Sequence, residues 1–262
     1  MKQAPAPWGE LASGKIILTL PADVLTHVHD PAAVLAYWDQ VIDLEDSLVG
    51  WPARSAPPER IVPDQEISAG FMHSGYPIMC MMGSGAGLVD LPKLKKEGAW
   101  GFFHELGHNH EAQAATFGSD YVEVNVNFCS LFVMEKLVGR DAIDGPQPAL
   151  KDFEKLLRDR LGPEKKSGAF ENLTMYVLPI KALGWEAFQK TLASYSAPDG
   201  AKGIKTREER MDEWVKRYSQ NAGRNLAPYF EVFQVTCSEQ TKETLKNLPV
   251  WLPKPGFPKT YN

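Results

Sequence analysis

The fold is decided by Trp100-Gly-Phe-Phe-His104-Glu105-Leu-Gly-His108-Asn109-His110-Glu111. The pattern His-Glu-x-x-His on a helix places two imidazoles one turn apart on the same face, where both point at one spot. A catalytic zinc ion needs three protein ligands and one open position for water. The sequence therefore predicts that His104 and His108 bind Zn²⁺ and that Glu105 takes a proton from the water at the open position.

The third ligand is expected on the next helical pattern, at roughly residues 120–139. Glu123 and Asn127 are four residues apart and so share one helix face. Glu123 is predicted to bind the metal, because the dipole at a helix N-terminus keeps a carboxylate ionised, as a ligand must be. Asn127 is predicted to orient a ligand from outside the coordination sphere.

Four other interpretations concern this third ligand. Asp120-x-x-Glu123 also fits a capping box, in which Glu123 only bonds the helix N-terminus, and residues 122–128 alternate with the period of a strand. Glu111 is a rival ligand, but it lies on the same helix as His108 and too close to reach round the ion. A metzincin would need Gly at position 111 and His at 114, where the chain has Glu and Ala.

Composition excludes several classes of protein. The chain has 262 residues, 44% hydrophobic and 23% charged, with a net charge of −5 and a pI of about 5.7. A mildly acidic chain lacks the basic surface of a nucleic-acid binder. No apolar run reaches the ~18 to 20 residues of a transmembrane segment. The N-terminus shows no signal peptide, and the three cysteines have no zinc or disulfide spacing.

The order of local patterns indicates an α+β fold. A strand is predicted at 16–20, a helix at 30–49, a polar connector at 52–63 and two short strands within 67–82. Helices are predicted at roughly 94–113, 120–139, 149–161, 170–180, 184–195, 205–221 and 225–233, before an extended tail. We expect one domain over 1–262, with a small mixed N-terminal lobe (1–93), a mainly helical lobe carrying the zinc site (94–262) and the active-site cleft between them.

Two stretches carry a resemblance to a known family. Ile67-Ser-Ala-Gly-Phe-Met-His-Ser-Gly-Tyr-Pro-Ile-Met79 and Lys95-Lys-Glu-Gly-Ala-Trp-Gly-Phe-Phe-His-Glu-Leu-Gly-His-Asn-His110 resemble the enhancin-like (M-sixty) metallopeptidases. They are also similar to the TRP-channel-associated factors, which share the peptidase-like domain but not the complete catalytic signature. The family's pattern is His-Glu-x-x-His, a spacer of roughly 8 to 28 residues, then Glu. Here 14 positions, 109–122, separate His108 from Glu123.

The resemblance implies a gluzincin-type zinc endopeptidase that acts on mucin-like, O-glycosylated proteins outside the cell or at its surface. The alternative is a catalytically silent module of the same fold that binds a glycoprotein or another partner. The oligomeric state is left open.

Two further parts of the active site are predicted from what the chemistry needs. In gluzincins a strand edge beside the metal pairs with extended substrate, so we expect residues 70–78, with His73 and Tyr76, to form that edge. A donor is needed to stabilise the oxyanion of the transition state. The candidate is Tyr176, with Tyr218 and His73 as rivals.

Overall fold

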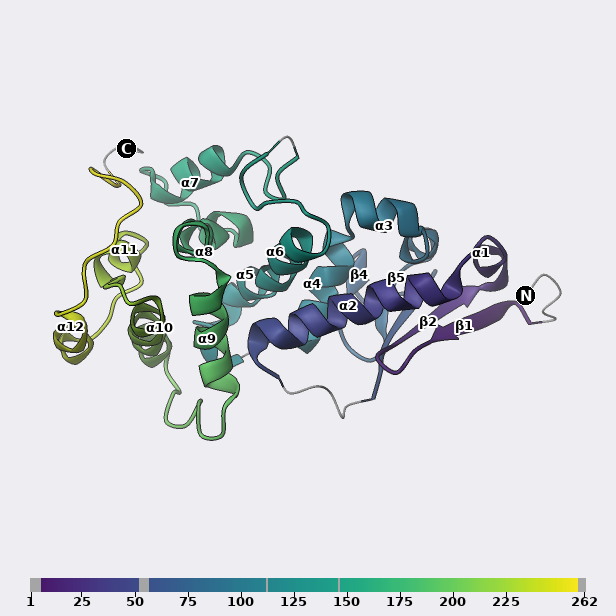
Figure 1. The fold of residues 1–262 in the computed structure, drawn as a ribbon, viewed down its shortest axis with the longest axis horizontal. Coiled ribbons are helices and arrows are strands. Elements are labelled where there is room, and N and C mark those ends of the chain that lie inside the picture. The colour runs from purple at the N-terminus through teal and green to yellow at the C-terminus, as the bar shows by residue number, and fades with distance from the viewer. Residues whose placement is uncertain (1–5, 52–56, 112, 146, 259–262) are drawn as a thin grey trace. The chain divides into compact units, whose positions relative to one another are not determined.

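A computed structural model describes residues 6–51, 57–111, 113–145 and 147–258 (Figure 1). The chain forms two compact units. The first unit contains Met1–Ser47, Pro52–Glu111 and Val126–Ala149, and the second contains Leu48–Trp51, Ala112–Asn125 and Leu150–Asn262. The predicted helical lobe, 94–262, is divided between the two units, because the helices at 91–109 and 127–136 belong with the sheet in the first unit.

The first unit is built on a five-stranded mixed sheet. Its strands are β1 (Trp8–Ala12), β2 (Ile16–Pro21), β3 (Glu59–Asp64), β4 (Met72–His73) and β5 (Ile78–Met81). They follow the order β1-β2-β3-β5-β4, in which β2, β3 and β5 are parallel while β1 and β4 run antiparallel to their neighbours. The parallel step from β2 to β3 is a crossover that carries the long helix α2.

The core of this unit lies on one face of the sheet. Ile16, Leu18 and Leu20 of β2 are buried, while the residues between them are half-buried, because successive side chains of a strand point to opposite faces. The helices of the unit are α1 (Ala22–Thr26), α2 (Pro31–Val49), η1 (Met82–Leu88), α3 (Leu91–Glu97), α4 (Trp100–Asn109) and α6 (Asn127–Lys136). Apolar residues of α2, α4 and α6 complete the same cluster as the buried strand residues.

The second unit is helical. Its elements are η2 (Gln113–Ala115), η3 (Ser119–Tyr121), α5 (Val122–Asn125), α7 (Phe153–Leu161), α8 (Ala169–Leu183), α9 (Trp185–Ser196), α10 (Arg207–Ala222), α11 (Ala227–Val232) and α12 (Glu239–Leu245). Its centre is a group of aromatic rings around Trp214, with Tyr176, Phe188 and Tyr218 each 5.4–5.7 Å from it between ring centroids. Helix α10 begins with a complete capping box, Thr206 and Glu209.

Most predicted elements are present, and the differences have local causes. The predicted helix at 94–113 is two helices, because Gly98, at φ 71°, ends α3 before α4 begins at Trp100. The predicted connector at 52–63 contains β3, whose alternating burial places Ile61 in the core. Residues 52–56 of that connector lie outside the described residues. Strand β1 and helix α12 have weak apolar patterns, and the sequence analysis did not predict them.

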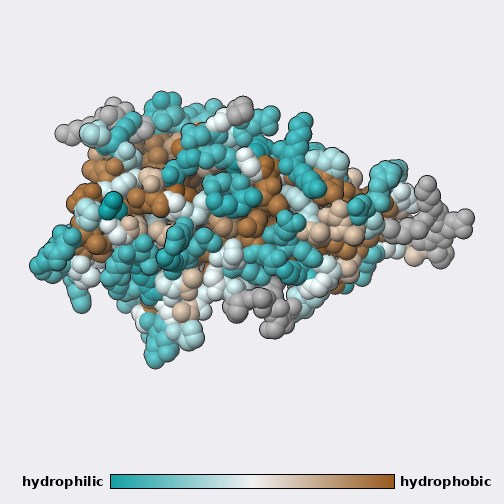
Figure 2. All heavy atoms as spheres, viewed as in Figure 1, coloured by the Kyte–Doolittle hydropathy of each residue, from teal (hydrophilic) through white to brown (hydrophobic). Residues whose placement is uncertain are grey.

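The surface carries both kinds of side chain. Figure 2 shows hydrophilic and hydrophobic residues interspersed on the face that it draws. No helix in the described part of the chain has the length and apolar character needed to span a bilayer.

Helices α4 and α6 approach each other closely at Gly107. A Cβ atom at this position would lie 2.8 Å from the carbonyl oxygen of Val126 and 3.1 Å from Cβ of Cys129. Cys129 is buried, and burial, followed by the nearby carboxylates of Glu45 and Glu111, raises the pKa of its thiol well above the usual range. The two helices therefore meet in close contact, which requires a residue without a side chain at position 107 of α4.

We expect Gly107→Ala to lower the free energy of unfolding by about 2 kcal/mol, because overpacking against a backbone oxygen outweighs the better helix propensity of alanine. Urea unfolding followed by circular dichroism measures the change. Gly83→Ala is the matched control, since a Cβ there has no neighbour within 4 Å. Equal stability of the two variants would contradict the close-contact argument.

Candidate metal centre

Three potential metal ligands come together in the structure. His104 and His108 of α4 and Glu123 of α5 each offer one ligand atom, and these atoms all lie within 4.8 Å of one another. In the described part of the chain this is the only such group of three or more His, Cys, Asp or Glu residues. The two imidazoles stand nearly perpendicular, with ring centroids 4.9 Å apart. Two nitrogens and one carboxylate oxygen are a donor set that suits zinc.

The residues of α4 are placed by the apolar face of that helix. Phe102, Phe103 and Leu106 are buried in the core of the first unit. The two histidines lie on another face and are half-buried. Glu105 follows His104 directly and is only 7% exposed.

Two hydrogen bonds to Asn127 indicate which ring nitrogen of His104 carries the hydrogen. The indole Nε1 of Trp100 donates to Oδ1 of Asn127 over 3.1 Å, and Nδ1 of His104 lies 2.9 Å from the same oxygen. An indole N–H can only donate, so the Asn127 atom it contacts is the oxygen. Nδ1 of His104 must then carry the hydrogen, which leaves the lone pair of Nε2 for a metal ion.

Asn127 therefore makes the contact expected of a residue that orients a metal ligand, although its effect on a bound metal stays a prediction. The side chain is 1% exposed and sits at the start of α6. The sequence analysis did not predict that Trp100 takes part. A tryptophan four residues before the first histidine, on the same helix face, was the available signal.

Glu123 lies in helical structure. Residues Val122–Asn125 form α5, so the strand alternative for this segment is wrong. The carboxylate of Asp120, the cap in the capping-box alternative, accepts a hydrogen bond from Arg207 over 2.7 Å. Glu123 is exposed.

A buried polar cluster that the sequence did not predict lies at the end of α4. His110 is fully buried; its Nδ1 donates to the carbonyl oxygen of Leu106 over 2.7 Å and lies 3.2 Å from a carboxylate oxygen of Glu45. Its Nε2 lies 3.1 Å from Oδ1 of Asp46. Both acids belong to α2. The available signal was the pair Glu45-Asp46 within a helix whose neighbouring positions are apolar.

The structure places the predicted substrate residues in different surroundings. His73 lies on β4, where Nδ1 contacts the carbonyl oxygen of Ser74 at 2.9 Å and Nε2 contacts the hydroxyl of Ser68 at 3.0 Å. Tyr76, in the turn after β4, is 61% exposed. The roles of both residues toward a substrate stay predictions.

Tyr176 does not fit its predicted role. The side chain is 1% exposed, among the rings of Phe117, Phe188 and Trp214 in the second unit. Burial raises the pKa of its hydroxyl well above the usual range. Tyr218, the rival, is also buried. A side chain enclosed in this way does not present its hydroxyl to a substrate, so the structure does not support either tyrosine as the oxyanion donor.

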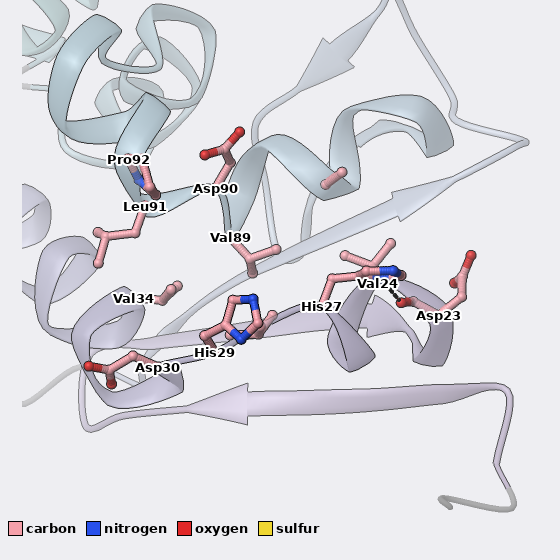
Figure 3. Close-up of a pocket in the computed structure, with 12 residues that line it drawn as sticks. Asp23, Val24, His27, His29, Asp30, Val34, Val89, Asp90, Leu91 and Pro92 are labelled. Carbon is pink, nitrogen blue, oxygen red and sulfur yellow. Dashed lines mark hydrogen bonds between the residues drawn. The ribbon is translucent and has the colours of Figure 1, made fainter. Parts of the chain in front are cut away.

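Two hollows are lined by residues of the first unit. One, of about 450 Å³, is lined by Phe71 and Met72 at β4, by η1, and by Trp100, Gly101 and Phe102 at the start of α4. The other, of about 550 Å³, is shown in Figure 3, with His27 and His29 on one side and Val89 and Asp90 on the other. The lining of the second hollow contains none of the three potential metal ligands.

The chain matches the family model of peptidase M60, enhancin and enhancin-like, over residues 1–234. Fold and site thus define a metallopeptidase-type domain, and the chain belongs to the M60 (enhancin-like) peptidase family. This confirms the family resemblance of the sequence and the mixed α+β fold class.

Similar proteins cover nearly the whole chain and are themselves longer. TRPM8 channel-associated factor 2 from Bos taurus is 35% identical over 266 residues, which is 97% of this chain, and the chain spans 28% of that protein's length. A functionally unknown conserved protein from Bacillus anthracis has a TM-score of 0.79 at 25% identity, covering 93% of this chain and 52% of that one. A metallopeptidase in complex with Tn antigen has a TM-score of 0.72 at 17% identity, and the match covers 95% of this chain and 53% of that one.

The hydrogen bond from His104 to Asn127 gives a prediction for metal affinity. We expect Asn127→Ala to weaken zinc binding by roughly 10- to 100-fold, the usual effect of removing a hydrogen-bond partner of a metal-bound histidine. Asn127→Asp keeps the acceptor and is expected to stay within a few-fold of the wild type. Competition with a chelating dye measures both affinities. An alanine variant that binds zinc as tightly as the wild type would refute the orienting role.

Proposed function

We propose that this chain is a zinc-dependent endopeptidase of the gluzincin class. The observation that carries the proposal is the convergence of the ligand atoms of His104, His108 and Glu123 within 4.8 Å, with Glu105 next to the first ligand. Two imidazoles and a carboxylate fit Zn²⁺ and leave one position for water. When bound, zinc supplies a Lewis acid that polarises the scissile carbonyl and lowers the pKa of water.

The protein's own residues then perform the proton transfers. Glu105 accepts a proton from the attacking water and passes it to the leaving amine, as a general base and then a general acid. Asn127 and Trp100 hold His104 in the tautomer that presents Nε2. The apolar residues Phe102, Phe103 and Leu106 pack α4 into the core of the first unit.

The proposed substrates are mucin-like, O-glycosylated proteins outside the cell or at its surface. Membership of the M60 family supports a peptidase, and one protein of similar fold was solved in complex with Tn antigen. The testing experiment is digestion of a mucin-type glycoprotein with and without a chelator, with mass spectrometry of the new N-termini. We expect new N-termini at glycosylated Ser or Thr only without chelator. Cleavage that persists after the metal is removed would contradict the proposal.

A second candidate is a catalytically silent module that binds a glycoprotein or another partner. The observation in its favour is the similarity to proteins named as TRPM8 channel-associated factors. Against it stands the presence of His104, Glu105, His108 and Glu123 together in this chain. Zinc binding without any cleavage of a glycoprotein would favour the silent module.

The role of Glu105 as a base and the roles of His104 and Glu123 as metal ligands can be distinguished by the zinc content of their variants. Glu105→Gln keeps the size of the side chain but removes the base, so we expect turnover to fall at least about 1,000-fold while zinc stays bound. His104→Ala and Glu123→Ala are expected to lose both activity and metal. Elemental analysis and the cleavage rate are measured on the same preparations. Full zinc occupancy in the ligand variants, or cleavage by Glu105→Gln, would contradict the assignments.

A further inference from the structure

Asn109, the last residue of α4, uses both atoms of its side-chain amide in hydrogen bonds to Glu59 and Gly75 of the first unit. Its Nδ2 donates to Oε2 of Glu59 over 2.8 Å and to the carbonyl oxygen of Gly75 over 3.2 Å. Its Oδ1 accepts from the N–H of Gly75 over 3.3 Å. The amide thus bonds both backbone groups of Gly75, as a residue on an adjacent strand would.

Gly75 lies in the turn between β4 and β5. Its φ of 120° is in the region that glycine adopts without strain. Phe71 and Tyr76, on either side of this segment, are among the most exposed large apolar side chains of the described residues. Strand β4 is last in the order of the sheet, so one of its edges has no strand neighbour among the described residues. The segment from Phe71 to Tyr76 is therefore an exposed edge with aromatic side chains.

The same edge touches α4 at a second place. A Cβ atom added to Gly101 would lie 2.7 Å from Sδ of Met72, so the Met72 side chain rests directly on the helix. Gly101 and Asn109 are eight residues apart, or about 12 Å along a helix. His104 and His108 lie between these two contacts. The exposed edge is thereby held at both ends against the helix segment that carries the two imidazoles.

We infer that Asn109 is a positioning residue, which sets the register of the exposed edge 71–76 along the metal-binding helix. An extended peptide that pairs with this edge is then presented at a fixed distance from His104 and His108. The inference rests on the proposed function, since it names how that site holds its peptide.

The surroundings of Asn109 require an amide. Glu59 is 6% exposed and accepts from Nδ2, and the Gly75 carbonyl accepts from the same nitrogen. A carboxylate at position 109 would face two acceptors and lose both bonds. Asn109→Asp therefore keeps the shape of the side chain and the bond from Gly75 N–H, but loses the two bonds that Nδ2 donates to Glu59 and to the Gly75 carbonyl oxygen.

The experiment measures binding in the full chain loaded with zinc, on the Glu105→Gln background, where nothing is cleaved. The probe is a synthetic Ser/Thr peptide that carries the Tn antigen, followed by fluorescence anisotropy. We expect Asn109→Ala and Asn109→Asp each to raise the Kd about tenfold, because the lost hydrogen bonds no longer order the edge. With Glu105 restored, we expect KM to rise by a similar factor and kcat to change less than about threefold, the pattern of lost uniform binding.

Asn221→Ala is the matched control. Asn221 is also in the last turn of a helix, α10, and donates to a side-chain oxygen, that of Thr191, over 3.0 Å. We expect this variant to bind peptide like the parent. Hydrogen exchange of the segment 71–78 provides a readout independent of peptide and catalysis, and we expect faster exchange only in the Asn109 variants.

The outcomes separate this inference from the proposed function. Unchanged exchange in the Asn109 variants, an unchanged Kd, or a fall in kcat at constant KM would each overturn the positioning role. If the wild type cleaves nothing but the Asn109 variants still weaken peptide binding, the inference stands and the proposed catalysis fails. Binding of the peptide by neither parent nor variants overturns the inference.

Discussion

The contact on which the candidate site depends is the close approach of α6 to α4. At Gly107 there is no room for a Cβ atom between the metal-binding helix and the start of α6. Because the helices meet here, Asn127 reaches back to His104, and the indole of Trp100 reaches the same amide oxygen. One missing side chain thus makes possible the hydrogen bonds that set the tautomer of a potential metal ligand.

Polar groups buried around α4 give the helix a defined position. His110 contacts Glu45 and Asp46 of α2 at one end, and Asn109 bonds Glu59 of β3 and the Gly75 turn. Burying such groups is costly unless they are paired, so these contacts specify one arrangement of α4 against the sheet. The apolar residues of α4 bury the helix, whereas the polar contacts determine which way its histidines face.

The comparisons and the site support different parts of the function. Family membership defines a peptidase M60 domain. In the relative named TRPM8 channel-associated factor 2 from Bos taurus, the matched segment makes up only 28% of the length. The donor set belongs to this chain itself. Metal-dependent catalysis is therefore argued from the residues present, and the glycoprotein substrate from the resemblance to other proteins.

The sequence by itself determined the local features: strand β2, helix α2, most helices of the second unit, and the pair His104 and His108 with Glu105 beside them. These follow from periodicity and a short motif, which are properties of neighbouring residues. Only the tertiary structure decided the rest. The buried His110 cluster, the link from Trp100 through Asn127 to His104, and the clamp between Asn109 and Gly75 join residues 23 to 65 positions apart. The structure also encloses Tyr176 among aromatic rings, which does not support it as the oxyanion donor. A local pattern predicts which residues share one face of a helix or strand. The distant group that lies opposite that face depends on how the helices and the sheet pack.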